Sequence, residues 1–111
     1  MSRKYKFHKP EGIYFVSFAT VNWIDVFSRR LYKDILVESI NYCISHKGLQ
    51  VYAWVIMSNH IHLLIRSDIG KLSDTIKEFK SFTAKKILDS IQNEPESRRD
   101  WILNLFEFSA K

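Results

Sequence analysis

Residues 50–66 read Gln-Val-Tyr-Ala-Trp-Val-Ile-Met-Ser-Asn-His-Ile-His-Leu-Leu-Ile-Arg, and they carry the clearest structural pattern in the chain. The segments 50–57 and 60–66 are rich in β-branched and aromatic residues, which favour strands. Ser58 and Asn59 between them are typical turn residues. The stretch therefore predicts a β-hairpin whose two strands are joined by a tight turn.

Two histidines, His60 and His62, flank one apolar residue at the start of the second strand of this hairpin. Because side chains alternate between the faces of a strand, we expect both imidazoles to leave one face and Ile61 to enter the core. Two neutral imidazoles side by side form part of a divalent-metal site, although hard cations need further oxygen donors. Paired histidines on a strand also arise by chance, so the pair alone leaves a metal site and an incidental pair open.

Upstream of the hairpin, the sequence predicts one strand and one helix. Residues 13–21 read as a strand buried on both faces, because apolar and β-branched types run almost without interruption. A loop over 22–27 follows. A helix is predicted over 29–47, with Ser28 as its N-cap and Gly48 at the position of a helix C-terminal glycine.

Downstream of the hairpin, the pattern predicts two helices. The first spans 72–92, begins after Gly70 and ends before Pro95, because the residue before a proline avoids helical geometry. The second spans 97–108. The order β-α-β-β-α-α predicts an α+β fold, a ferredoxin-like or RNA-recognition-like sandwich with an antiparallel sheet and helices on one face. The usual closing strand is not evident.

Length and composition predict one globular domain. The 111 residues suffice for one core, so we expect a single domain with a flexible basic arm at 1–11 and a folded core at 12–108. No apolar run approaches the roughly 20 residues of a membrane span. No export signal is evident, and the single Cys43 excludes an internal disulfide, which suits a cytoplasmic protein without membrane contacts.

The formal net charge of +5 favours a polyanionic partner. Lysines recur at three- or four-residue steps along the predicted helix over 72–92, so several could share a face. Other basic residues and one loop aromatic could add phosphate and base contacts. The candidate DNA contacts are Lys77, Lys80, Ser81, Lys85, Arg29, Arg30 and Trp23. A solvated helix surface accounts for the lysines equally well.

The stretch from Tyr52 to Ile65 resembles the signature of the single-tyrosine transposases of the His-hydrophobic-His superfamily, specifically the REP-associated tyrosine transposases and their insertion-sequence relatives. Those proteins typically show Met-Pro-Asn-His-apolar-His-Leu-Leu, and Ser58 here replaces the proline. The resemblance covers roughly residues 12–108. It extends to three further segments, 15–20, 23–27 and 79–85.

The resemblance implies a ferredoxin-like sandwich, usually a homodimer, that binds hairpins of single-stranded DNA. Such enzymes cut one strand and stay attached through a phosphotyrosine bond. A metal, typically Mg²⁺ or Mn²⁺, is held by the two histidines and a third polar side chain and polarises the scissile phosphate. Carried onto this chain, the resemblance makes His60 and His62 the metal ligands.

One feature of that family is missing from this sequence. The nucleophilic tyrosine of the family lies on a downstream helix, yet no tyrosine follows His62. No catalytic residue is therefore assigned, and we expect a C-terminally truncated member that does not cleave DNA by the family mechanism. Two alternatives stay open: a catalytically inactive DNA- or RNA-binding sandwich, and a protein-interaction domain whose histidines are incidental.

Overall fold

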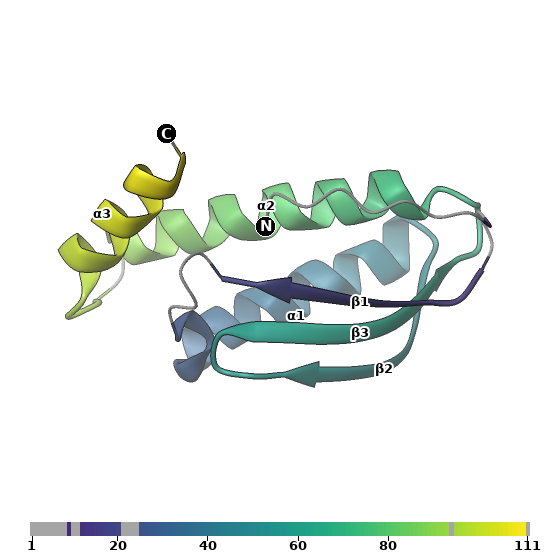
Figure 1. The fold of residues 1–111 in the computed structure, drawn as a ribbon, viewed down its shortest axis with the longest axis horizontal. Coiled ribbons are helices and arrows are strands. Elements are labelled where there is room, and N and C mark those ends of the chain that lie inside the picture. Colours follow the sequence, from purple (N-terminus) through teal and green to yellow (C-terminus); the bar gives the residue numbers. More distant parts are fainter. Residues whose placement is uncertain (1–8, 10–11, 21–24, 94, 111) are drawn as a thin grey trace.

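The structure is a computed structural model, and it describes residues 9, 12–20, 25–93 and 95–110, the last six of these by their backbone alone (Figure 1). The predicted arm at 1–11 therefore lies outside the described residues except for Lys9. The elements in chain order are β1 (Tyr14–Ala19), the 3-10 helix η2 (Val26–Ser28), α1 (Arg30–His46), β2 (Leu49–Ile56), β3 (His60–Ser67), α2 (Leu72–Asn93) and α3 (Arg99–Ala110).

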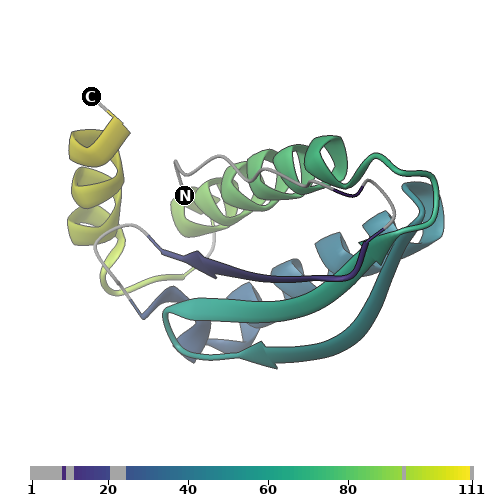
Figure 2. The ribbon, with the colours of Figure 1, turned by 45° about the vertical axis from the view of Figure 1, so that its right-hand side comes forward.

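The three strands form one antiparallel sheet in the order β1-β3-β2, so that β3 is the central strand. Helices α1 and α2 lie on the same side of this sheet, and its other face is turned toward the viewer in Figure 1 (see also Figure 2). The predicted α+β fold, with an antiparallel sheet and helices packed against it, is confirmed. In the part of the chain that the structure describes, no fourth strand joins the sheet.

The sheet buries one face and leaves the other open. In β3, Ile61, Leu63 and Ile65 are buried, and the residues between them are only partly covered. The prediction that the first strand is buried on both faces is wrong, because Ile13, Phe15 and Ser17, which share one face, are exposed. The apolar run of that strand reflects β-propensity, since burial along it has a period of two.

One hydrophobic core fills the space between the sheet and the helices. Helix α3 contributes Ile102, which is fully buried. The other main contributors are Val16 and Phe18 of β1, Leu36 and Ile40 of α1, and Ile76, Phe79 and Ile87 of α2. Together with Thr83, which is also buried, these helix positions recur every three or four residues, which is the spacing of an amphipathic helix.

The prediction for α1 is correct at the C-terminal end of the helix and wrong at its N-cap. Gly48 follows the helix with φ 70°, where a Cβ would also collide with Oδ1 of Asp68, so the predicted terminal glycine is confirmed. The prediction that Ser28 caps the helix is wrong. Ser28 lies in η2 and its hydroxyl donates to the carbonyl of Asp25, while Arg29 occupies the N-cap and makes no side-chain capping hydrogen bond.

The predicted hairpin is present, with β2 and β3 beginning and ending within one residue of their predicted limits. The N–H of Met57 donates to the carbonyl of His60 at 2.8 Å and closes the two-residue turn. The pairing shifts register at Tyr52, where a bulge interrupts β2. Across the described ranges, no helix combines the length and the apolarity that a membrane crossing requires.

Candidate functional site

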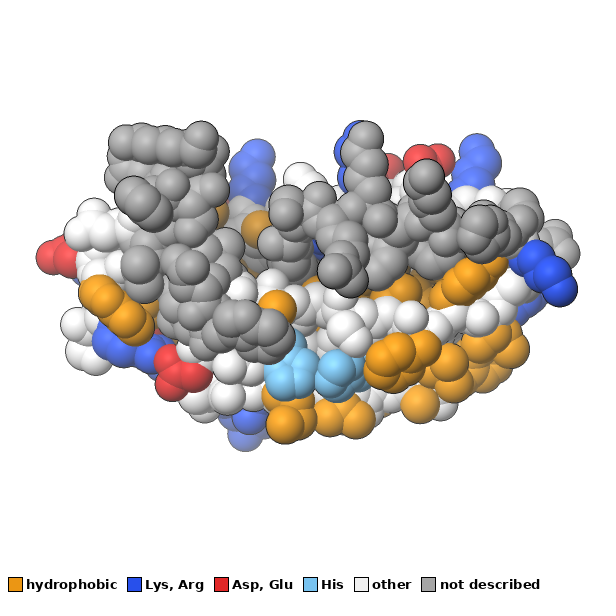
Figure 3. All heavy atoms as spheres, in the orientation of Figure 1, with side chains coloured by type: hydrophobic (Ala, Val, Ile, Leu, Met, Phe, Trp, Pro, Cys, Tyr) orange, Lys and Arg blue, Asp and Glu red, His pale blue; other side chains and the backbone are white. Residues whose placement is uncertain are grey.

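His60 and His62 project together from the open face of the sheet, as the alternation of β3 predicted. Both lie on the central strand and are partly exposed, with Ile61 between them fully buried. Their ring centroids are 4.7 Å apart and the rings stand nearly perpendicular, at 80°. In Figure 3 the histidine side chains lie side by side on this face, with hydrophobic side chains beside and below them.

Each imidazole is held through its Nδ1 atom by a hydrogen bond. Nδ1 of His62 lies 2.6 Å from the hydroxyl of Ser17, its register partner on β1. Nδ1 of His60 lies 2.7 Å from Oδ1 of Asn59 in the hairpin turn. The ring of Phe15 also stacks on His62, with centroids 5.5 Å apart and 18° between the planes. Two hydrogen bonds and one ring contact therefore fix the orientation of the pair.

Sequence reasoning missed these three supporting residues. Asn59 directly precedes the first histidine, so its position in the motif was a usable signal. Ser17 and Phe15 are some 45 residues away in the chain, and only the strand register brings them to His62. No local pattern specifies that register.

The donor chemistry of the pair suits a divalent cation. Because Nδ1 of each ring is in a hydrogen bond, Nε2 is the atom that each ring would offer to a metal. No group of three or more His, Cys, Asp or Glu side chains placed to hold a metal was found among the described residues. The third ligand of the expected set is therefore not identified within those ranges, and water or phosphate oxygens would complete the coordination shell.

The face around the histidines is largely apolar. Val55 pairs with His62 in the register and is 50 % exposed, and Phe15 is 67 % exposed. At the far end of β3, Arg66 donates to Oε1 of Gln50 at 3.0 Å. A flat surface with an exposed aromatic ring beside two imidazoles is suited to contacts with unstacked bases.

The predicted basic contacts on α2 do not all lie together. Lys77, Ser81 and Lys85 are exposed. Lys80 is partly buried, with Nζ 5.7 Å from the ring centroid of Phe18 in β1, and this burial lowers the pKa of Lys80. Because Phe18 belongs to the helix-covered face, Lys80 lies beside that layer of the sheet rather than on the open face.

The other predicted contacts are placed differently again. Arg29 donates to the carbonyl of Pro95 at 2.6 Å and lies over the ring of Tyr32, so its guanidinium is tied to neighbouring residues although the side chain is 38 % exposed. Arg30 is almost fully exposed, in a long contact of 3.9 Å with Asp34. Trp23 lies outside the described residues.

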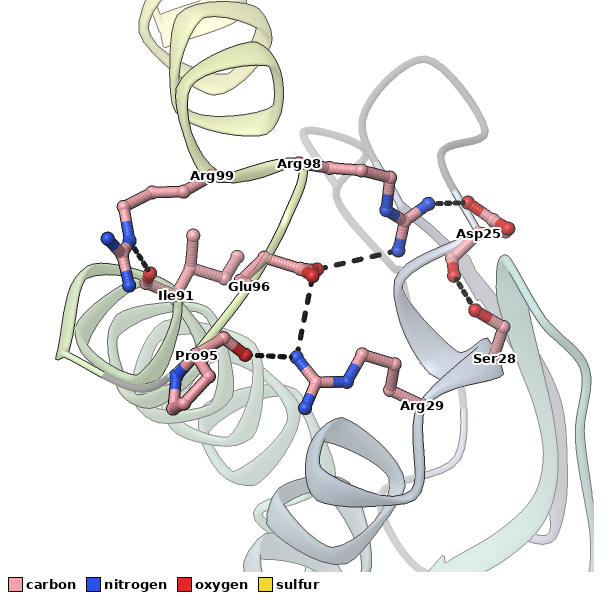
Figure 4. Close-up of polar contacts among 8 residues, drawn as sticks. All are labelled: Asp25, Ser28, Arg29, Ile91, Pro95, Glu96, Arg98 and Arg99. Carbon is pink, nitrogen blue, oxygen red and sulfur yellow. Dashed lines mark hydrogen bonds and ion pairs between the residues drawn. The ribbon is translucent and has the colours of Figure 1, made fainter.

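A second polar cluster joins the start of α1 to the segment between α2 and α3 (Figure 4). The carboxylate of Glu96 is 3 % exposed and pairs with Arg29 at 3.4 Å and with Arg98 at 3.5 Å. Arg98 also donates to Asp25, and this hydrogen bond lowers the pKa of Asp25. The cluster fastens the chain before α3 to the body of the fold.

The tyrosines in the described part of the chain lie in unrelated places. Tyr32 is fully buried, and burial raises the pKa of its hydroxyl. Tyr42 stacks on His46 on the helical layer. The hydroxyl of Tyr52 donates to Gln50, toward the end of the sheet away from His60. The hydroxyl of Tyr14 donates to the carbonyl of Lys9.

Comparison with known proteins gives a family for the chain. A family model described as "Transposase IS200 like" matches residues 12–107. No curated protein matches the chain. The crystal structure of a "putative transposase" from Deinococcus radiodurans R1 is similar, with a TM-score of 0.61 and 18 % identity over 96 % of this chain and 95 % of that one. At 18 % identity, this structural similarity shows a shared fold and nothing about function. Because the family match spans the hairpin, both histidines and both long helices, the chain belongs to the IS200-like transposase family.

Proposed function

We propose that this chain binds single-stranded or hairpin DNA at the open face of its sheet, together with Mg²⁺ or Mn²⁺ at His60 and His62. The observation that carries this proposal is the same-face pair of imidazoles, each held through Nδ1 so that Nε2 would serve as the ligand atom. Membership of a transposase family supports DNA as the polyanion, and the net charge of +5 agrees with it.

The division of labour at the site follows from the donor atoms. A bound divalent ion supplies charge that polarises a DNA phosphate. The two histidines fix where that phosphate lies on the sheet, and the apolar side chains around them, Phe15 and Val55, contact the adjoining sugar and bases.

We propose further that these 111 residues bind DNA without cutting it. No tyrosine follows His62 in the sequence. Of the described tyrosines, Tyr32 is buried, Tyr14 and Tyr52 donate to Lys9 and Gln50, and Tyr42 is exposed on α1, where it stacks on His46. A labelled DNA hairpin incubated with the protein and Mn²⁺ is expected to give no covalent adduct on a denaturing gel. A protein-bound band would contradict this, and Tyr→Phe variants at the five tyrosines would then identify the nucleophile.

The metal-dependent part of DNA binding can be tested by fluorescence anisotropy with the same hairpin. His60→Gln and His62→Gln are each expected to weaken binding in Mn²⁺ by about tenfold or more and to leave binding in chelator unchanged. His46→Gln is the matched control, because His46 stacks on Tyr42 in the helical layer. Equal Mn²⁺ dependence in the wild type and the double variant His60→Gln/His62→Gln would refute the site.

A second candidate is a nucleic-acid-binding sandwich that works without metal. It is favoured by one observation, the exposed ring of Phe15 on the open sheet face, where RNA-recognition folds stack bases. If this candidate is correct, Phe15→Leu weakens single-strand binding by about 1–3 kcal/mol in chelator as well as in Mn²⁺. An unlabelled RNA hairpin would then compete as well as DNA.

The assembly and location are proposed on the same family basis. We propose a homodimer that works in the cytoplasm, and the buried free thiol of Cys43 is compatible with a reducing compartment. Light scattering of the purified chain, with and without the DNA hairpin, measures the mass directly. A monomer under both conditions would overturn the proposed dimer and leave the DNA site untouched.

A further inference from the structure

We propose that Asn59 and Ser17 are positioning residues that hold His60 and His62 in the tautomer with hydrogen on Nδ1, so that both rings present a lone pair on Nε2 to one ligand. The inference deepens the proposed function, since it concerns the same two histidines. Its test is independent of the test of the proposed function, because the tautomer of a histidine ring is measured without metal or DNA.

The assignment for His60 follows from the chemistry of its partner. The atom 2.7 Å from Nδ1 is Oδ1 of Asn59, and an amide oxygen can only accept a hydrogen bond. Nδ1 of a neutral His60 must therefore carry the hydrogen. Nε2 is then the unprotonated nitrogen, which is the form that a metal requires.

Asn59 is itself fixed by the chain around it. Its carbonyl accepts two hydrogen bonds from Thr20 at the end of β1, one from the N–H at 2.9 Å and one from the hydroxyl at 3.2 Å. The preceding carbonyl, that of Ser58, accepts from the N–H of Phe27 at 2.8 Å. Hydrogen bonds therefore hold the backbone of both turn residues, Ser58 and Asn59. The side-chain amide that orients His60 extends from this fixed backbone.

The assignment for His62 needs a second argument, because a hydroxyl can donate or accept. The bond from Ser17 at 2.6 Å fits either tautomer. The stacked ring of Phe15 and the strand register hold the imidazole so that Nδ1 faces β1. If the hydrogen were on Nε2, His62 would turn an N–H toward the ligand position and repel a cation. A shared ligand therefore requires that Nδ1–H donates to Ser17.

Each of the two hydrogen bonds orients a different histidine, so the role of Ser17 and the role of Asn59 can be tested separately. Ser17 bonds to the ring on its own register line, and Asn59 bonds to the ring that follows it in the chain. Loss of one bond should release one ring and leave its neighbour as it was. A general loosening of the strand would instead affect both rings.

The test is the long-range ¹H–¹⁵N spectrum of the histidine rings, recorded without metal at a pH where both rings are neutral. The wild type is expected to show hydrogen on Nδ1 of both rings. Ser17→Ala should convert His62 alone to a mixture of tautomers, and Asn59→Ala should do so for His60 alone. Ser17→Thr keeps the hydroxyl on a strand-favouring residue and should preserve the wild-type pattern. Ser73→Ala, at an exposed serine on α2, is the control and should leave both tautomers unchanged.

A calorimetric titration with Mn²⁺ gives the second readout. Ser17→Ala and Asn59→Ala are each expected to weaken Mn²⁺ binding by about tenfold, and Ser17→Thr to restore it. Hydrogen on Nε2 of either wild-type ring, or an unchanged His62 pattern in Ser17→Ala, would overturn the proposal. Correct tautomers in a wild type that binds no Mn²⁺ would support the positioning roles and refute the proposed metal site instead.

Discussion

At the scale of single residues, Tyr32 shows how burial decides what a side chain can do. It is fully buried in α1, beside the guanidinium of Arg29, and its hydroxyl has no hydrogen-bond partner among the described residues. Burial raises the pKa of this hydroxyl, and the nearby carboxylate of Glu96 raises it further. A tyrosine in this state contributes its ring to the core and is a poor nucleophile.

Removing only the hydroxyl of Tyr32 should therefore cost little. We expect Tyr32→Phe to change the free energy of unfolding by less than about 1 kcal/mol, or to raise it, since an unpaired buried hydroxyl is itself unfavourable. Tyr32→Ala should cost about 3–5 kcal/mol, because it leaves a cavity. Urea denaturation measures both. A loss above about 2 kcal/mol in Tyr32→Phe would mean that the hydroxyl makes a hydrogen bond in solution.

At the scale of elements, the cluster around Glu96 attaches α3 to the rest of the fold. Its partners come from the start of α1 and from the turn before α3, and Arg99 adds a bond of 2.7 Å to the carbonyl of Ile91. Ile102 provides the apolar part of the contact. Among the described side chains, the polar cluster, Ile102 and the partly buried Leu103 attach α3 to the fold.

Neutralising the buried carboxylate should loosen that attachment. We expect Glu96→Gln to lower the free energy of unfolding by about 1–3 kcal/mol, because hydrogen bonds to two guanidinium groups lose their charge. Hydrogen exchange should accelerate in α3 more than in β3. Glu38→Gln, at an exposed position of α1, is the control and should have no effect. Uniform acceleration across the sheet would contradict a local role for Glu96.

The contact between Asp25 and Arg98 adds a dependence on pH. The hydrogen bond from Arg98 holds the pKa of Asp25 below its ordinary value of 3.8. The folded state therefore gains stability above that pH and loses it as the pH falls through the lower folded pKa. Both groups are partly exposed, so the contribution should stay under about 1 kcal/mol. Asp25→Asn should flatten this part of the acid-unfolding curve, and an unchanged curve would exclude the contact in solution.

Local patterns in the sequence were sufficient for the order of elements and for the common face of His60 and His62, because periods of 2 and 3.6 are local properties. They were insufficient where distant segments meet. The bond from Ser17 to His62 and the ion pair from Asp25 to Arg98 join residues 45 and 73 positions apart. Burial of the first strand was mispredicted for a related reason, since composition does not show which face a helix will cover.

At the scale of the whole molecule, part of the charge is already paired within the fold. The net charge of +5 arises from 17 basic and 12 acidic residues, and several of the described ones already pair within the fold. Lys47 pairs with Glu78 at 2.9 Å, and Arg29 and Arg98 are held by Glu96. Among the predicted basic contacts, those that remain exposed are Lys77 and Lys85 of α2 and Arg30 of α1.

Salt dependence of hairpin binding tests that distribution. Each phosphate contact to a single strand contributes about 0.7 to the slope of log affinity against log salt, because binding releases counterions. If Lys77 and Lys85 each contact a phosphate, the double variant Lys77→Gln/Lys85→Gln should reduce the slope by about 1.4. Lys33→Gln, an exposed lysine on α1, is the charge-matched control for a single substitution and should leave the slope unchanged. If the double variant keeps the wild-type slope while His62→Gln still removes the Mn²⁺ dependence, DNA lies on the sheet face without reaching α2.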